Sequence, residues 1–275
     1  WASYLRLEGN SVGTIRSKQS GVRWFHVRNY KPDPFKNLLT YKEWLADEEK
    51  KDAPPQPKLG VPPQMVELVV RSSGSSLNAE VIKCACSAGF WFLLRCVEML
   101  GADPRRSLTW EDVLPRDCHG NIQSLEEMSS DTTTGIGLRL FCRKGSAHTC
   151  TRSVKARYDL VTCPVVRFQA LYRAYVKHVG RVPPPQQSPF MMQDRSIFSR
   201  ERLAEVLKAA GETFGLASNR VATHSLRRGG TSTYYASNRV TEQDLMRFGR
   251  WSSTAYYRYV TAHQDMLNKE AGEPG

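Results

Sequence analysis

The sequence predicts a two-domain protein that is mainly α-helical and carries one small antiparallel β-sheet. Apolar residues recur at helical spacing over much of the chain, whereas residues 138–154 alternate as in a β-hairpin. Five prolines within residues 54–63 cannot form a helix or an inner strand, so they indicate a boundary between domains. At 275 residues, the chain is long enough for two domains.

The chain is strongly basic. Its 39 Lys and Arg against 27 Asp and Glu give a formal net charge of +12 and a pI near 9.5, which favours a polyanionic partner, either nucleic acid or an anionic membrane. The composition is too apolar, at 40%, for a disordered chain. The longest apolar run, residues 89–94, is far shorter than the roughly 20 residues of a membrane span.

No signal peptide opens the chain, and its seven cysteines are an odd number. Both observations favour a reducing compartment and argue against secretion. Because the first residue is Trp1 rather than Met, we expect the true start to lie upstream and the N-terminal domain to be truncated. Cys84 and Cys86 give the one hint of a metal site, but their spacing would place the two sulfurs on different helix faces, so we expect no metal.

Residues 1–58 form the predicted N-terminal domain. Its first 42 residues carry eight basic side chains against two acidic ones. Ile15, Val22 and Phe25 fall on one helical face, with the basic side chains elsewhere, so this segment predicts a helix with a basic side. An acidic patch at residues 43–52 and the prolines follow.

Residues 59–275 form the predicted second domain. Its first helix covers residues 77–100, with a break expected near Gly89. The alternating strands flank a turn at Gly145-Ser146. Further helices are predicted at residues 163–178, from an N-cap at Ser199 to about Gly211, and over 224–260 with an interruption at 240–242.

The most informative segment is residues 220–258, which holds seven basic residues against two acidic ones. His224 and Arg227 are three residues apart, so a helix brings both to one spot. A guanidinium binds phosphate in a bidentate manner, an imidazole transfers protons, and the phenol of a nearby tyrosine can attack phosphorus. From residue types alone, a simple phosphate-binding surface is an equally good interpretation.

The spacing resembles a known family. His224-x-x-Arg227, followed by Gly-Arg-Trp-Ser-Ser at 249–253 and by Tyr259 eight residues after Trp251, is similar to the closing signature of the tyrosine recombinases, the phage-integrase family. The Gly-Arg-Trp-Ser-Ser form resembles the recombinases of DIRS- and Crypton-type mobile elements most. Residues 89–100 and 108–113 resemble the family's first box, and Lys144 stands where the family keeps a lysine on a hairpin turn.

The resemblance implies a metal-free DNA strand transfer in which Tyr259 forms a 3′-phosphotyrosine. It implies six catalytic residues and one supporting carboxylate: Arg95, Lys144, His224, Arg227, Trp251 and Tyr259, with Glu98 in support. Three assignments stay open at this point. Arg143 and Lys155 compete with Lys144, Tyr256 competes with Tyr259, and Arg250 competes with Trp251 for the role of the family's second histidine, because Tyr259 lies one residue nearer Trp251 than in bacteriophage members.

The family fold implied is a C-shaped DNA clamp, in which a helical core-binding domain and the catalytic domain close around duplex DNA. The expected partners are double-stranded DNA with a specific recombination site and, on it, a homotetramer, with no cofactor and no membrane. The nucleus is the expected location in a eukaryotic host, and the cytoplasm or nucleoid otherwise. The expected DNA contacts are Arg16, Lys18, Arg23, Lys58, Arg143, Arg152, Arg228 and Arg250.

Other functions compete with site-specific integration or excision. A type IB topoisomerase or a telomere resolvase would share the chemistry, and a domesticated DNA-binding protein would keep the fold without it. A metal-dependent transposase needs three carboxylates on a sheet; Asp112, Asp117 and Asp131 have no such context, so the sequence argues against it.

Overall fold

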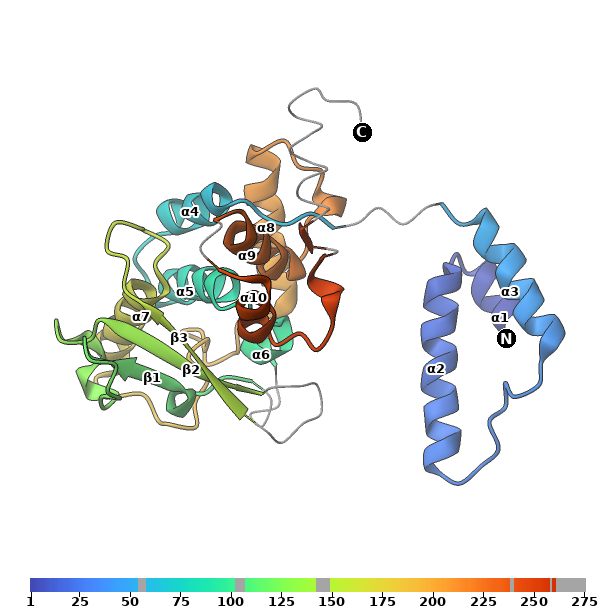
Figure 1. Ribbon diagram of the computed structural model, residues 1–275, viewed down its shortest axis with the longest axis horizontal. Coiled ribbons are helices and arrows are strands. Elements are labelled where there is room, and N and C mark those ends of the chain that lie inside the picture. The colour runs from blue at the N-terminus through green and yellow to red at the C-terminus, as the bar shows by residue number, and fades with distance from the viewer. Residues whose placement is uncertain (54–57, 102–106, 142–148, 238–239, 258, 261–275) are drawn as a thin grey trace. The chain divides into compact units, whose positions relative to one another are not determined.

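The computed structural model describes residues 1–53, 58–101, 107–141, 149–237, 240–257 and 259–260. The chain divides into two units, Trp1–Gln56 and Pro57–Gly275. The predicted hairpin turn at Gly145-Ser146, together with Arg143 and Lys144, lies outside the described residues. Figure 1 shows the helices and strands of both units.

The first unit consists of three helices, α1 (Ala2–Leu7), α2 (Val12–Arg28) and α3 (Leu39–Lys51). The predicted N-terminal helix is thus confirmed as α2, which begins where the Ser11 hydroxyl accepts a hydrogen bond from the Thr14 N–H. The acidic patch proves to be helix α3. The core is small, and its buried members are Ala2, Val12, Ile15 and Leu45.

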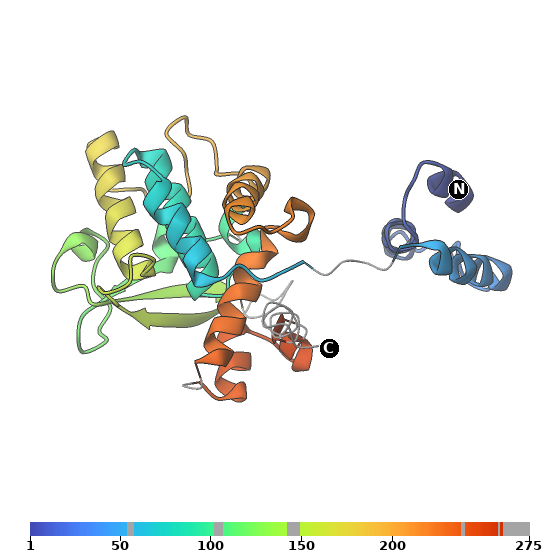
Figure 2. The ribbon, with the colours of Figure 1, turned by 90° about the horizontal axis from the view of Figure 1, so that it is seen from above.

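Ion pairs and hydrogen bonds connect the helices of the first unit. Arg6 of α1 donates to Glu48 at 2.9 Å and also pairs with Asp52, while Asp52 accepts the N–H of Val12 at 2.8 Å. These bonds hold α1, the start of α2 and the end of α3 together. Figure 2 shows the three helices from above.

The second unit contains the predicted small antiparallel sheet. Its strands are β1 (Val113–Arg116), β2 (Gly135–Phe141) and β3 (Thr149–Lys155), in the order β1-β2-β3. The hairpin strands were predicted, although β2 begins three residues earlier than expected. The sequence analysis missed β1, which contains Pro115 and forms an edge of the sheet opposite Ile136.

Helices make up most of the regular secondary structure of the second unit and confirm the predicted mainly α fold class. They are α4 (Pro63–Ser72), α5 (Leu77–Trp91), α6 (Cys96–Leu100), α7 (Pro164–Val179), α8 (Arg200–Thr213), α9 (His224–Ala236) and α10 (Glu242–Gly249), with short 3-10 turns η1 (Trp110–Asp112), η2 (Glu126–Ser129), η3 (Ser218–Arg220) and η4 (Thr254–Tyr256). The predicted N-cap at Ser199 and the interruption after α9 are confirmed.

Helix α5 lies at the centre of the second unit. Nearly all of its residues are buried, and it packs on α4, α7 and α9 (Figures 1 and 2). The close approach of α9 requires a glycine, because a Cβ on Gly230 would overlap the carbonyl oxygen of Phe90. This packing holds α9 directly against the buried helix α5.

The expected break near Gly89 is wrong in position. Helix α5 continues through Gly89, which packs against Leu226 and Met99, and ends at Trp91. The chain then turns at Leu93, which adopts a φ of 52°, and restarts at α6. A leucine rarely adopts positive φ, so surrounding contacts must hold this turn.

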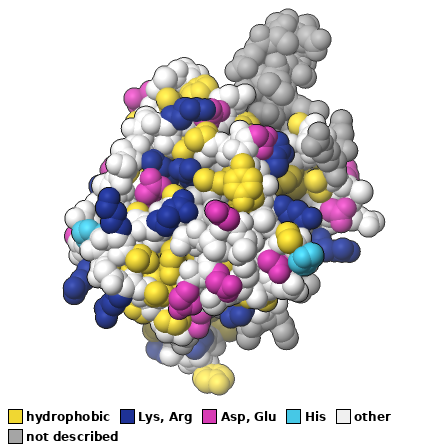
Figure 3. All heavy atoms as spheres, turned by 90° about the vertical axis from the view of Figure 1, so that its left-hand side faces the viewer, with side chains coloured by type: hydrophobic (Ala, Val, Ile, Leu, Met, Phe, Trp, Pro, Cys, Tyr) yellow, Lys and Arg dark blue, Asp and Glu magenta, His cyan; other side chains and the backbone are white. Residues whose placement is uncertain are grey.

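The surface beside the sheet carries basic and acidic side chains intermixed with apolar ones (Figure 3). Such mixing produces no field of a single sign on that face. Within the described residues, no helix is long and apolar enough to cross a bilayer.

Candidate active site

The first helical turn of α9 carries His224 and Arg227 on one side, as the spacing predicted. Nε2 of His224 lies 2.8 Å from the hydroxyl of Tyr259, and the two rings meet edge to face with centroids 5.4 Å apart. The residues are 35 positions apart in the chain. The structure thus brings a phenol and an imidazole into direct hydrogen-bonding contact.

Burial, followed by the positive charges of Arg227, Arg228, Arg95 and Arg200, lowers the pKa of His224 to about 4. The imidazole is therefore neutral at pH 7. A neutral imidazole with an unprotonated Nε2 can accept the phenolic proton of Tyr259.

Of three neighbouring tyrosines, each has a distinct environment. Tyr256 is fully buried, and burial raises the pKa of its phenol. The hydroxyl of Tyr257 donates to Glu242 at 2.6 Å, and this bond raises the pKa of Tyr257. Tyr259 is half-buried beside His224, with the guanidinium of Arg228 5.1 Å from the centre of its ring.

The backbone around Tyr259 is held in place. The Ser232 hydroxyl of α9 donates to the carbonyl of Tyr259 at 3.1 Å. Tyr256 and Val260, on either side in the sequence, are buried in a small cluster with Leu93 and Leu245. The cluster fixes where the Tyr259 hydroxyl lies.

Trp251 packs against Tyr259 and Arg227. Its ring centre lies 5.8 Å from that of Tyr259, and the Arg227 guanidinium lies 4.4 Å from its centre. Gly249 makes room for the indole, since a Cβ there would overlap the ring. Trp251 therefore connects the tyrosine segment to the arginine of α9.

Arg227 is almost entirely buried, at 1% exposure. It donates to the carbonyl oxygens of Leu93 and Gly249, which uses two of its five N–H groups. Burial, followed by the charges of Arg250 and Arg95, lowers its pKa.

Glu98 joins two further arginines at the start of α6. One carboxylate oxygen accepts from the Arg95 guanidinium at 2.9 Å, and the other accepts from Arg250 at 2.7 Å and from the Arg95 N–H at 2.6 Å. Arg250 also donates to the carbonyl of Leu93 at 3.3 Å. The side chain of Arg250 is 1% exposed, whereas that of Arg95 is 30% exposed.

These contacts explain the turn at Leu93. Its carbonyl oxygen accepts from both Arg227 and Arg250, so two guanidinium groups stabilise the positive φ that ends α5. Three arginines and one carboxylate leave a net positive charge in a half-buried site. Such a site favours an anionic ligand such as phosphate.

The expected DNA-contact residues that the structure describes make contacts within the protein. Arg16 pairs with Glu49 and Arg23 with Asp33, while Lys18 donates to the side chain of Asn10. In the second unit, Lys58 donates to the carbonyl of Asn219, and Arg228 donates to the carbonyl of Lys58. Arg152 donates to the carbonyls of Arg247 and Phe248. The side chain of Arg250 is buried against Glu98.

Sequence reasoning missed Arg200 and the carbonyl oxygen of Leu93. Arg200 opens α8 and its charge acts on His224, although 24 residues separate the two. No local signal connects them, because only the tertiary fold brings the charge of Arg200 near His224. The same is true of Leu93, because every residue has a backbone carbonyl and no sequence pattern distinguishes this one.

No protein-family model matches the chain, and no curated protein matches it. Matches were found among solved structures. The XerA recombinase is 14% identical with a TM-score of 0.49, covering 100% of this chain and 97% of that one. A fragment of the Tn1549 transposon integrase in complex with circular intermediate DNA is 12% identical with a TM-score of 0.48, covering 98% and 82%.

A variant of the same integrase fragment in complex with transposon right-end DNA is 14% identical, with a TM-score of 0.51, and covers 99% of this chain and 82% of that chain. This match shows that the chain has the fold of the integrase. The resemblance to the tyrosine recombinases, which the motifs indicated, is therefore supported at the level of the fold.

Proposed function

We propose that the protein is a site-specific DNA recombinase that cleaves and rejoins DNA strands through Tyr259. One observation carries the proposal: the Tyr259 hydroxyl lies 2.8 Å from Nε2 of a neutral histidine, in a site enriched in arginine. A nucleophile and its base within hydrogen-bonding distance, beside groups that bind phosphate, are the arrangement that phosphoryl transfer requires.

In the proposed reaction the phenolic oxygen of Tyr259 attacks a backbone phosphorus, and the bond from phosphorus to the 5′-oxygen breaks. His224 accepts the phenolic proton, and the products are a 3′-phosphotyrosine and a free 5′-hydroxyl. The 5′-hydroxyl of another strand reverses the step on new DNA. Because the phosphodiester energy stays in the covalent bond, the exchange needs no ATP.

Arg95 and Arg227 would stabilise the nonbridging oxygens, whose charge grows in the transition state. The partly exposed guanidinium of Arg95 supports this role directly. Arg227 would bind these oxygens through the N–H groups that do not donate to the carbonyls of Leu93 and Gly249. Loss of one such donor costs about 3 kcal/mol, or roughly a hundredfold in rate. Lys144 would protonate the leaving 5′-oxygen.

Trp251 and Arg250 would have separate tasks. The contacts of Trp251 with Tyr259 and Arg227 support a role in holding the nucleophile. Arg250 faces Glu98 instead, so we assign it to positioning that carboxylate, and through it Arg95, rather than to DNA contact.

The proposed partner is duplex DNA with a specific site, bound by a homotetramer. The net charge of +12 and the DNA complexes of the Tn1549 integrase support DNA as the partner. Arg152, Arg228 and Lys58 donate hydrogen bonds to backbone carbonyls and would exchange these for DNA phosphates. Integration or excision of a mobile element is the proposed outcome.

Covalent trapping tests the proposal. The protein is mixed with a pool of nicked duplexes and Holliday junctions in EDTA, denatured, and examined for protein–DNA adducts. Tyr259→Phe is expected to abolish the adduct, because it removes the attacking oxygen. Tyr257→Phe is the matched control and is expected to keep it, because that hydroxyl faces Glu242.

An adduct that survives in the Tyr259→Phe protein would contradict the assignment of the nucleophile. A second function has its own support, since both Nη groups of Arg227 are engaged with carbonyl oxygens. In that function the fold binds DNA without cutting it. Salt-dependent binding with no adduct on any substrate would favour it.

A further inference from the structure

One face of α2 carries large apolar side chains at the surface. Trp24 is 61% exposed and Phe25 is 55% exposed, in a unit whose core is small. Arg28 lies between them on the helix, four residues after Trp24 and three after Phe25, and Lys18 lies on the same side. We call Lys18, Gly21, Trp24, Phe25 and Arg28 the outer face of α2.

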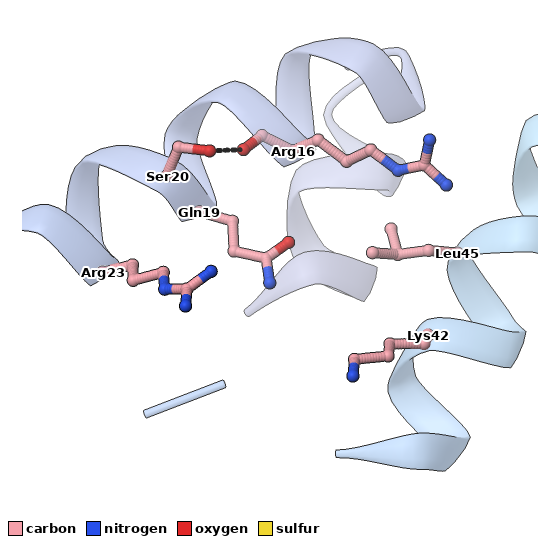
Figure 4. A pocket seen from close by; sticks show the side chains of 6 residues that line it. All are labelled: Arg16, Gln19, Ser20, Arg23, Lys42 and Leu45. Carbon is pink, nitrogen blue, oxygen red and sulfur yellow. Dashed lines mark hydrogen bonds between the residues drawn. The ribbon is translucent and has the colours of Figure 1, made fainter. Parts of the chain in front are cut away.

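The opposite side of α2 borders a cavity of about 280 Å³ against α3, lined in part by Arg16, Arg23 and Lys42 (Figure 4). The two arginines there are already neutralised, since Arg16 pairs with Glu49 and Arg23 pairs with Asp33, both at 2.8 Å. Much of the positive charge on this side is therefore neutralised by ion pairs within the protein.

The basic residues of the outer face are not neutralised in this way. The Arg28 guanidinium stacks 5.1 Å from the centre of the Trp24 ring, and Lys18 donates to the amide oxygen of Asn10. Within residues 1–53, neither has a carboxylate at ion-pairing distance. The outer face thus combines free positive charge with exposed aromatic rings.

We propose that the outer face of α2 binds single-stranded DNA. Free cations fit a chain of phosphates, and exposed aromatic rings gain by stacking on nucleobases. In a duplex the faces of the bases are already covered by their neighbours, so only unpaired bases offer these rings a partner. Gly21 lets a strand approach the helix closely, because nothing lies within 4 Å of where its Cβ would be.

The inference rests on the proposed function only in taking DNA as the partner. Strand exchange unpairs bases between cleavage and rejoining, so an unpaired strand is present at that stage. Binding of that strand needs no cleavage, and the test below has no cleavage step.

The test measures the affinity of the full chain for three fluorescent probes by anisotropy: an oligothymidine of about 20 nucleotides, an abasic strand with the same phosphates, and a duplex of equal length. Trp24→Ala is expected to weaken oligothymidine binding roughly tenfold, through the lost stacking, and to leave duplex binding unchanged. Arg28→Gln is expected to reduce the salt slope for the oligothymidine by about 0.7. Lys50→Gln on α3 of the same unit is the matched charge control, because Lys50 pairs with Asp47 at 2.9 Å.

Two results would overturn the inference. Equal affinity for the abasic strand and the oligothymidine would show that charge alone acts. An equal loss of duplex affinity in Trp24→Ala would show that the outer face binds paired DNA instead. Arg28 is exposed, so Arg28→Gln changes no buried residue and reports on binding even if Trp24→Ala alters folding. The Tyr259→Phe protein is expected to bind the oligothymidine as the wild type does, whether or not strand cleavage occurs.

Discussion

His224 shows how strongly an environment can change a single residue. A histidine in water has a pKa near 6.5, so a large part of its population is charged near neutral pH. Burial and the surrounding arginines bring the pKa of His224 down to about 4. The imidazole is thereby ready to accept a proton at pH 7, and an arriving phosphate would raise its pKa by offsetting the arginine charges.

This lowered pKa predicts a pH-dependent stability. Between pH 6.5 and about 4 the unfolded chain binds a proton on His224 that the folded chain does not, so the free energy of unfolding must fall as the pH falls through this range. We expect a loss of roughly 2 kcal/mol by about pH 5, and a smaller loss in His224→Gln. Urea unfolding of both proteins at pH 6.5 and at about pH 5 measures this loss. An equal loss of unfolding free energy in the wild type and in His224→Gln would contradict the lowered pKa of His224.

At this scale the sequence predicts part of the site. The spacing of His224 and Arg227 places them on one helical side, and it does so without tertiary information. The hydrogen bond between His224 and Tyr259 depends instead on how α9 and the last segment pack. Whether Arg250 or Trp251 lies next to Tyr259 was also undecidable from the sequence, since the positive φ of Arg250 turns its side chain away toward Glu98.

At the scale of the elements, the turn between α5 and α6 depends on contacts from distant helices. Leu93 accepts hydrogen bonds from Arg227 of α9 and from Arg250 after α10. A glycine is the local signal for a helix break, so the sequence pointed to Gly89. The real break lies at Leu93 because the arginines, more than 130 residues away, stabilise it.

The same network predicts the effect of removing Arg250. Arg250→Ala leaves the buried Glu98 with only Arg95 as a charged partner, which costs about 3 kcal/mol in unfolding free energy. Arg247→Ala is the control, since Arg247 is exposed on α10 and its loss should change stability by less than about 0.5 kcal/mol. Denaturant unfolding of both variants measures the difference, and similar stabilities would show that Glu98 does not need Arg250.

Strand β1 illustrates the opposite limit of sequence reasoning. It is four residues long, contains Pro115, and pairs with β2 on one side. Proline argues against an inner strand, and four residues are too few for a clear alternation. The hairpin strands, seven residues each, gave the alternation that β1 lacks.

At the scale of the whole molecule, the boundary between the units is sharper than the proline stretch alone suggests. The segment after it belongs to the second unit, because Leu59 donates to the carbonyl of Arg220 at 2.9 Å and Val61 donates to that of Ser225 at 3.1 Å. Val61 is also buried in the core of that unit. The proline stretch thus leads directly onto α9.

The substitution Gly60→Ala tests the attachment of residues 59–61 to α9. A Cβ there would come within 2.8 Å of the backbone nitrogen of Gly229, so Gly60→Ala must displace either the segment at residues 59–61 or α9. We expect a loss of about 2 kcal/mol in unfolding free energy, together with slower adduct formation. Gly74→Ala is the control, because no atom lies within 4 Å of its added methyl group. Equal stability and activity in the two variants would show that the junction tolerates displacement.

The attachment at Leu59 and Val61 also has a mechanical consequence. Ser225, which holds Val61, is the residue next to His224. Any tension carried by the chain between the two units enters the second unit at this anchorage and acts on the first turn of α9 before it reaches the rest of the core. The chain between the units and the imidazole of His224 are therefore mechanically connected in series, so a pull on one unit is applied within a few residues of the proposed base.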